Sequence, residues 1–211
     1  MKSPARKKKR SLSANKDAGP DLKTLVILTM VTLLLLGGAI GFRMQLSAHH
    51  ENIGGAYTLF DTQGQKVTQD NFRGRYTALY FGYTHCIDVC PLTLDTISAA
   101  LERMGPEGQN IVPVFISVDP QRDTPAVMQN YIARFSPRIV GLSGSPEQLK
   151  PVLDAFHVTV RRQDAKVADN LIDHTSILYV MDGQNHLAGM IPIDDSAEQM
   201  AVDLARILDK N

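Results

Sequence analysis

The feature that most constrains this chain is an uncharged apolar run of nineteen residues near its N-terminus. The run reads TLVILTMVTLLLLGGAIGF from Thr24 to Phe42 and is closed by Arg43. In a helix that rises about 1.5 Å per residue it spans roughly 28 Å, close to the ~30 Å hydrocarbon core of a bilayer. A buried core helix does not explain the run because it has no polar face. A secretory signal peptide usually has a shorter apolar core of about 7–15 residues. We therefore expect a transmembrane anchor over residues 24–43.

The charged residues are distributed unevenly about this run, although the whole chain balances 22 Lys and Arg against 22 Asp and Glu. Residues 1–23 contain eight basic and two acidic side chains, which leaves 14 basic and 20 acidic ones from residue 24 onward. By the positive-inside rule, the cluster Arg6–Arg10 predicts a cytoplasmic leader over residues 1–23. Binding of this cluster to nucleic acid is the less favoured alternative.

The rest of the chain then lies on the far side of the membrane, in the bacterial periplasm or, alternatively, in the mitochondrial intermembrane space. The leader lacks the long Arg- and Ser-rich stretch of a mitochondrial transit peptide, so we favour the bacterial inner membrane. After a linker at 44–52, residues 53–211 suffice for one globular domain with a proper core. An apolar content of 44% excludes a disordered chain, and two cysteines are too few for a disulfide scaffold.

Apolar runs and helix-start signals alternate along this domain. The predicted strands are 57–60, 66–68, 77–83, 111–118, 139–142, 158–160, 176–181 and 187–192. The predicted helices run from 91 to about 104, from 123 to about 135, from 145 to 156 and from about 196 to 208. Gly64 supplies the turn of an N-terminal hairpin. The order predicts an α/β fold, a thioredoxin-like mixed sheet with helices on both faces and an added N-terminal β-hairpin, preceded by one transmembrane helix.

The two cysteines, Cys86 and Cys90, lie where a buried strand turns into the helix that opens at Pro91. A helix N-terminus stabilises a thiolate, so we expect a lowered pKa for Cys90, which is near the cap, and consider one for Cys86. A disulfide that closes so few residues contributes little stability, and inert exported thiols would oxidise. Reversible redox chemistry and metal binding remain. The three intervening residues, one more than in the thioredoxin motif, let both thiolates converge on a soft ion such as Cu(I) or zinc.

Imidazole suits copper as a third ligand, and His174 is the candidate by position. It stands just before the strand at 176–181, and in a thioredoxin-like fold the loop entering that strand lies against the cysteine-bearing turn. Asp173 could orient the His174 imidazole, or it could be a solvated turn residue. The other histidines are His49 and His50 in the linker, His85, which is expected to point away from Cys86, and His157 and His186, which look like edge or turn positions.

Three motifs in this order resemble the Sco family, membrane-anchored copper chaperones of cytochrome c oxidase assembly. They are Cys86-Ile-Asp-Val-Cys90-Pro91, Ser117-Val-Asp-Pro-Gln-Arg-Asp-Thr-Pro125 and Asp173-His174-Thr175. The resemblance covers the anchor and nearly the whole domain. It implies a thioredoxin-like domain that binds Cu(I) or Cu(II) through Cys86, Cys90 and His174. It further implies that Asp88 tunes the copper site, whereas stabilising the helix N-terminus is its alternative role. The segment Asp119–Pro125 is interpreted as a turn and a helix cap.

The function implied by the resemblance is that of a metallochaperone, a binding protein rather than an enzyme. It delivers copper to the dinuclear copper centre of cytochrome c oxidase subunit II. The alternative is a membrane-tethered thiol–disulfide oxidoreductase that reduces the cysteines of that centre. Expected partners are oxidase subunit II and other copper chaperones or thiol reductases, and no nucleic acid. A peroxiredoxin-like peroxidase is disfavoured because Thr84 is available but no Arg adjoins the cysteine motif.

Overall fold

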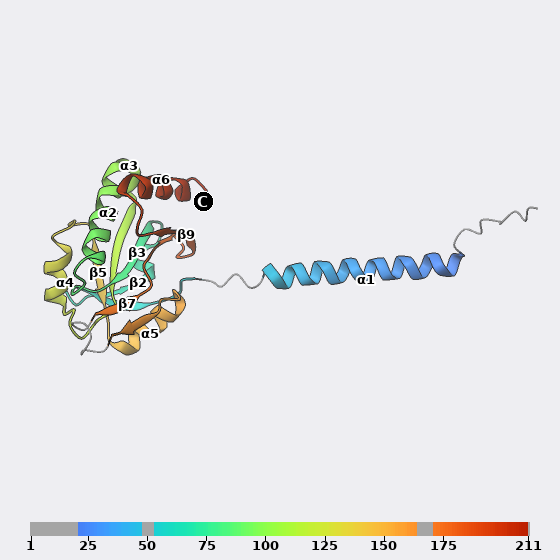
Figure 1. The fold of residues 1–211 in the computed structure, drawn as a ribbon, viewed down its shortest axis with the longest axis horizontal. Coiled ribbons are helices and arrows are strands. Elements are labelled where there is room, and N and C mark those ends of the chain that lie inside the picture. Colours follow the sequence, from blue (N-terminus) through green and yellow to red (C-terminus); the bar gives the residue numbers. More distant parts are fainter. Residues whose placement is uncertain (1–20, 48–52, 164–170, 211) are drawn as a thin grey trace, which may run out of the picture. The chain divides into compact units, whose positions relative to one another are not determined.

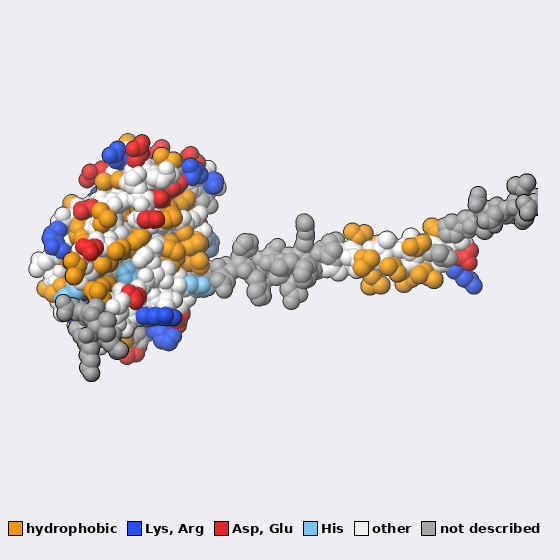
Figure 2. All heavy atoms as spheres, in the orientation of Figure 1, with side chains coloured by type: hydrophobic (Ala, Val, Ile, Leu, Met, Phe, Trp, Pro, Cys, Tyr) orange, Lys and Arg blue, Asp and Glu red, His pale blue; other side chains and the backbone are white. Residues whose placement is uncertain are grey.

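The protein is described by a computed structural model over residues 21–47, 53–163 and 171–210, and it divides into two compact units, residues 1–51 and 52–211. In the first unit, helix α1 (Leu22–Ser47) covers the uncharged run. Figure 2 shows hydrophobic side chains along its described part, with charged ones at its beginning. Within the described ranges, no helix is both long and apolar enough to cross a membrane. Predictions for the basic cluster, for His49 and for His50 fall outside those ranges.

The second unit is built on a seven-stranded mixed sheet with the strand order β2-β1-β5-β4-β3-β8-β9. The strands are β1 (Thr58–Asp61), β2 (Lys66–Thr68), β3 (Tyr76–Gly82), β4 (Ile111–Ser117), β5 (Val140–Ser143), β8 (Ile177–Met181) and β9 (Leu187–Pro192). Strands β3, β4 and β5 are parallel, and all other pairs in the sheet are antiparallel. The predicted N-terminal hairpin is confirmed: β1 and β2 extend the sheet beyond β5, and Gly64 in their turn has a φ of 76°.

Helices cover both faces of the sheet, as predicted (Figure 1). They are the short η1 (Gln69–Phe72), α2 (Val89–Arg103), α3 (Pro106–Gln109), α4 (Pro125–Ile132), α5 (Pro146–Ala155) and α6 (Ala197–Leu208). Helices α4, α5 and α6 begin where the side chains of Thr124, Ser145 and Ser196 accept a hydrogen bond from a backbone N–H of the first turn. Helix α4 ends at Ile132, three residues before the predicted end, and α3 was not predicted.

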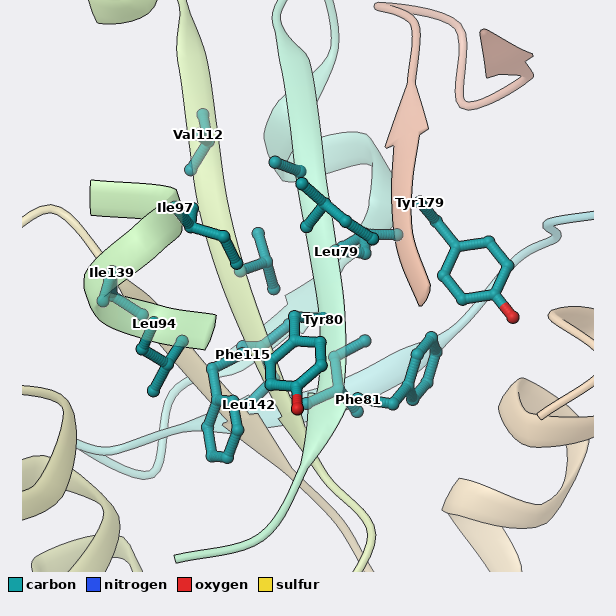
Figure 3. Close-up of a cluster of buried hydrophobic side chains, with 14 of the residues drawn as sticks. Leu79, Tyr80, Phe81, Leu94, Ile97, Val112, Phe115, Ile139, Leu142 and Tyr179 are labelled. Carbon is teal, nitrogen blue, oxygen red and sulfur yellow. The ribbon is translucent and has the colours of Figure 1, made fainter. Parts of the chain in front are cut away.

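The core packs around β3, whose successive side chains point to opposite faces of the sheet (Figure 3). Tyr80 lies on the α2 face, with its ring centroid 6.2 Å from that of Phe115 on β4. Phe81 lies on the α5 face, 5.4 Å from Phe156 and 5.8 Å from Tyr179. All five rings are buried, so the carboxyl end of β3, from which the cysteine loop starts, is fixed from both sides.

A two-stranded antiparallel ribbon, β6 (Val160–Arg162) with β7 (Ile172–His174), lies outside the seven-stranded sheet. We refer to it as the β6–β7 ribbon. The strand predicted at 158–160 is therefore wrong in its bounds, because pairing with β7 sets the register and places Val160 opposite His174. Val158 precedes the strand and is buried in the core.

Candidate metal centre

The cysteines follow β3 directly, on a tight connection between a central strand and the first turn of α2. Cys90 is the second residue of that helix and is fully buried, whereas Cys86 is half-buried in the loop, and both are free thiols. The last residue of β3 is Gly82. A Cβ atom at this position would lie 2.8 Å from the Phe115 ring and 3.1 Å from Cys90 Sγ. The close approach of strand and thiol therefore requires glycine.

Hydrogen bonds distinguish the two sulfur atoms. Cys86 Sγ accepts a hydrogen bond from the backbone N–H of Cys90 at 3.3 Å. The Cys90 thiol, and then the backbone N–H groups of Cys90, Asp88 and Val89, lower the pKa of Cys86 to about 5, against the opposing effect of burial. The hydrogen bond to Cys86 and burial raise the pKa of Cys90. The expectation of a lowered pKa at Cys90 is wrong, because the pair shares one proton and the buried sulfur keeps it. Near neutral pH, Cys86 is the thiolate.

His174, the last residue of β7, lies beside this pair. Its Nε2 atom is 3.8 Å from Cys90 Sγ, and its Nδ1 atom is 3.0 Å from the backbone oxygen of Thr175. A carbonyl oxygen only accepts hydrogen bonds, so Nδ1 is the donor in this contact and Nε2 is the nitrogen that faces Cys90 Sγ. The rings of Tyr80 and Tyr83 contact the imidazole edge-on, with centroids at 6.3 Å and 6.0 Å.

The two aspartates singled out from the sequence line the same hollow as Cys86 and His174, a pocket of about 320 Å³. Asp88 is exposed and is the N-cap residue of α2, but its side chain makes no capping hydrogen bond. The Asp173 carboxylate accepts two hydrogen bonds from Gln163 Nε2, at 2.9 Å and 3.0 Å. The atom that orients the imidazole in this structure is the Thr175 oxygen.

The remaining described histidines are His85, His157 and His186. His85 Nδ1 is 3.1 Å from Thr84 Oγ1 and 3.7 Å from an Asp123 carboxylate oxygen. His157 follows α5 with a φ of 53°, and His186 lies in the β8–β9 turn, in agreement with the prediction.

Sequence reasoning missed the roles of two tyrosines. The Tyr80 hydroxyl donates a hydrogen bond to Cys90 Sγ at 3.5 Å, and the Tyr83 hydroxyl accepts one from the backbone N–H of Ile172 on β7 at 3.2 Å. A signal was available, because a buried phenol in an otherwise apolar strand needs a polar partner for its hydroxyl group.

The donor set suits a soft metal ion: two thiol sulfurs and one imidazole nitrogen match the ligands preferred by Cu(I). In protein zinc sites the metal–sulfur distance is about 2.3 Å and the metal–nitrogen distance is about 2.0 Å. With a sulfur–metal–nitrogen angle of about 120°, the sulfur and nitrogen atoms then lie roughly 3.7 Å apart. The observed 3.8 Å between Cys90 Sγ and His174 Nε2 fits that spacing. Across the described part of the chain, however, no three His, Cys, Asp or Glu side chains are already gathered as a complete metal site.

Comparison with known proteins identifies the family. A model of the SCO1/SenC family matches residues 46–209. The chain belongs to the SCO1/SenC family. The SCO1 homolog 1 of Arabidopsis thaliana mitochondria is 41% identical over 136 residues, which make up 64% of this chain and 41% of that protein. The chain thus spans less than half the length of that relative.

Two solved Sco structures, each described as having copper bound, share the fold of the second unit. Arabidopsis thaliana ScoI has a TM-score of 0.72 and 34% identity, and the match covers 75% of this chain and 99% of that one. Bradyrhizobium japonicum ScoI has a TM-score of 0.67 and 40% identity, with 74% and 99% covered. Copper is thus bound in homologous Sco structures, and the thioredoxin-like fold is that of the family.

Proposed function

We propose that this protein is a copper-binding metallochaperone that delivers copper to the dinuclear copper centre of cytochrome c oxidase subunit II. The observation that carries the proposal is the approach of His174 Nε2 to Cys90 Sγ, at 3.8 Å, beside the Cys86 thiolate. The copper bound in the Arabidopsis and Bradyrhizobium structures supports the choice of metal. Membership of the SCO1/SenC family supports the role in oxidase assembly.

The proposed ligands are Cys86, Cys90 and His174. Two thiolates favour Cu(I), and the imidazole extends the set to Cu(II). Because the described side chains are not yet gathered as a complete site, we expect a side-chain adjustment when copper binds. The half-buried Cys86 lines an open pocket, which gives a copper ion a route in and out. Asp88 and Asp173 line this pocket and are proposed to tune the site through their charge.

We further propose that residues 24–43 anchor the protein in the bacterial inner membrane, with the leader in the cytoplasm and the copper-binding domain in the periplasm. The uncharged run and the basic cluster that precedes it support this topology. An alkaline phosphatase fused after Asn211 is expected to be active. An inactive fusion that is expressed in full would refute the topology.

Copper binding by the full-length reduced chain tests the function. Cu(I) is titrated in competition with a chromophoric chelator, and Cu(II) spectra are recorded for the wild type, His174→Ala and the control His186→Ala. His186 is a suitable control because its exposed side chain lies in a turn away from the thiols. We expect near-stoichiometric copper in the wild type, and a loss of affinity of about tenfold or more with an altered spectrum for His174→Ala alone. Equal affinities and spectra for all three proteins would refute the three-ligand site.

The second candidate function is thiol–disulfide exchange, which is favoured by the half-buried Cys86 thiolate with a second free thiol, Cys90, next to it. The Cys86 thiolate would attack a partner disulfide, forming a mixed disulfide and releasing one partner thiolate. Cys90 would then lose its proton and attack the Cys86 sulfur, forming the Cys86–Cys90 disulfide and releasing the second partner thiolate. Two electrons pass from the cysteine pair to the partner, and the direction depends on the two reduction potentials. Weak copper binding together with rapid reduction of an oxidase subunit II peptide disulfide would favour this function over the first.

A further inference from the structure

His174 belongs to the β6–β7 ribbon, which is separate from the seven-stranded sheet. His174 ends β7, and the β6–β7 ribbon has no strand pairing with the seven-stranded sheet. The cysteines, by contrast, follow β3 at the centre of that sheet. Strand β8 of the main sheet begins three residues after His174, so the distance between the imidazole and the thiols depends on β8 and on the contacts that fix the ribbon to the body of the domain.

A buried carboxylate provides the first such connection. Asp119, in the loop after β4, has no exposed surface, yet its Oδ1 atom accepts a hydrogen bond from Arg162 Nη2 at 2.9 Å. Arg162 is the last residue of β6 and lies opposite Ile172 in the ribbon. This ion pair joins the β4–α4 loop directly to the ribbon that carries His174.

The second connection starts from the other oxygen of the same carboxylate. Asp119 Oδ2 accepts a hydrogen bond from Arg122 Nε, and the Arg122 guanidinium lies 5.8 Å from the centre of the Tyr83 ring. The Tyr83 hydroxyl in turn accepts the backbone N–H of Ile172, and its ring contacts the His174 ring edge-on. Both connections from Asp119 thus lead to the β6–β7 ribbon: the first ends on β6, and the second ends on β7, which carries the imidazole.

The same loop also holds the cysteine side of the site, through a different carboxylate. Asp123 is 1% exposed and accepts hydrogen bonds from the backbone N–H and the hydroxyl group of Thr84, two residues before Cys86, and from the Ser117 hydroxyl. A buried, charged carboxylate needs such hydrogen bonds to compensate for its lost hydration. Asp119 and Asp123 therefore keep their hydrogen-bond partners in fixed positions.

We propose that Asp119 is a positioning residue that fixes the His174 imidazole relative to Cys86 and Cys90 through Arg162 and Arg122. The consequence for copper affinity rests on the proposed function, whereas the consequence for the metal-free protein does not. The segment interpreted from the sequence as a turn and a helix cap therefore acts on the metal centre as well.

The test compares Asp119→Asn with two matched variants in the full-length chain. Asp123→Asn makes the same change in the same loop, but on the connection to the cysteines. Asp203→Asn removes another Asp–Arg pair spaced three residues apart, on α6. Cu(I) affinity is measured for each variant with and without His174→Ala. In the reduced metal-free proteins, amide hydrogen exchange at Ile172 and the imidazole nitrogen signals of His174 are measured by NMR.

We expect Asp119→Asn to lower copper affinity about 10- to 100-fold, the range typical of groups that orient metal ligands. In the His174→Ala background the same change should alter affinity less than about twofold, because the group it positions is gone. Asp123→Asn should lower affinity in both backgrounds, and Asp203→Asn in neither. In the metal-free proteins, Asp119→Asn should be the only one of the three variants that speeds amide hydrogen exchange at Ile172 and shifts the imidazole nitrogen signals of His174.

The proposal is overturned if Asp119→Asn lowers only thermal stability and leaves the Ile172 exchange rate and the His174 signals unchanged. It is also overturned if the effect on affinity persists at full size in the His174→Ala background. If Asp119→Asn does not fold, Arg162→Gln provides the test, because this half-exposed side chain can be shortened without opening the core. It should give the same metal-free changes, and their absence overturns the proposal. Failure of the wild type to bind copper would refute the proposed function alone.

Discussion

The pH dependence of Cys86 alkylation is a quantitative test of the electrostatics at the cysteine pair. The Cys90 thiol and the backbone N–H groups that surround Cys86 Sγ lower its pKa to about 5, compared with about 8.5 for an ordinary cysteine. At pH 7 the group is then about 99% thiolate instead of about 3%. A thiol with a pKa lower by about 3.5 is also roughly 25- to 55-fold less nucleophilic, so the two effects nearly cancel at pH 7.

The effects separate at low pH. At pH 5 about half of Cys86 is thiolate, roughly 1,600-fold more than for an ordinary cysteine. After the loss in nucleophilicity, Cys86 should still react about 30- to 60-fold faster than an ordinary cysteine. As pH falls through about 5 the thiolate is protonated and the rate declines, whereas above about pH 6 the rate is constant. Cys90 is fully buried, so the first alkylation occurs at Cys86.

The assay is iodoacetamide labelling of the reduced, metal-free full-length chain between pH 4 and pH 9, followed by mass spectrometry. Cys90→Ala removes the donor with the largest effect on the pKa of Cys86, so the midpoint of the profile should move up. Cys90→Ser is the matched control, because its hydroxyl group can still donate and the midpoint should stay low. A wild-type midpoint near 8.5, or identical midpoints for the wild type and Cys90→Ala, would refute the assignment of the thiolate to Cys86.

Three stability predictions follow from the packing, each measured by chemical denaturation. Leu94→Ala on α2 should lower the free energy of unfolding by about 2–5 kcal/mol because this side chain is buried. The control Leu92→Ala changes an exposed side chain of the same helix and should alter the free energy of unfolding by less than about 0.5 kcal/mol. Gly82→Ala should destabilise by about 1–3 kcal/mol, since the new methyl group would lie 2.8 Å from the Phe115 ring, and an unchanged midpoint would contradict this packing. Thr124→Ala should lower the free energy of unfolding by about 0.5–2 kcal/mol through loss of the α4 cap, and no loss would show that the cap is unimportant.

The sheet and its central strands could be predicted from the sequence because their signals are local. Strands β3 and β4 are nearly continuous apolar runs, as strands buried on both faces must be, and their bounds agree with the prediction to within one residue. The start of α4 was likewise visible, since a Thr-Pro pair gives both a cap and a first-turn proline. A general thioredoxin-like arrangement sufficed to bring His174 to the cysteine turn.

Strand β7, its pairing with β6 and the connections of the ribbon could not be predicted, because their signals are long-range. Each strand has three residues, too short for any periodicity, and β7 ends on a polar pair. Asp119 and Asp123 look like ordinary turn residues in the sequence. Their burial becomes apparent only when the fold brings Arg162 and Thr84 to them, from 43 and 39 residues away. The assignment of the thiolate also depended on the hydrogen bond between the two cysteines and on burial, which the position of Cys90 near the helix cap did not reveal.

The separation of the candidate ligands along the chain has a consequence for the order of events in the cell. Cys86 and Cys90 are close neighbours in any conformation, but His174 is 84 residues beyond Cys90. Closing a loop of that length in an unfolded chain costs roughly 4 kcal/mol of entropy. A newly made chain therefore offers a copper ion two sulfur donors, and only a completely folded one offers the imidazole as well. If copper binds as proposed, loading follows folding, and an ion at a free concentration 100 times its Kd stabilises the folded protein by about 2.7 kcal/mol. Release of copper then removes this stabilisation, so the copper-free protein is the form most exposed to proteolysis.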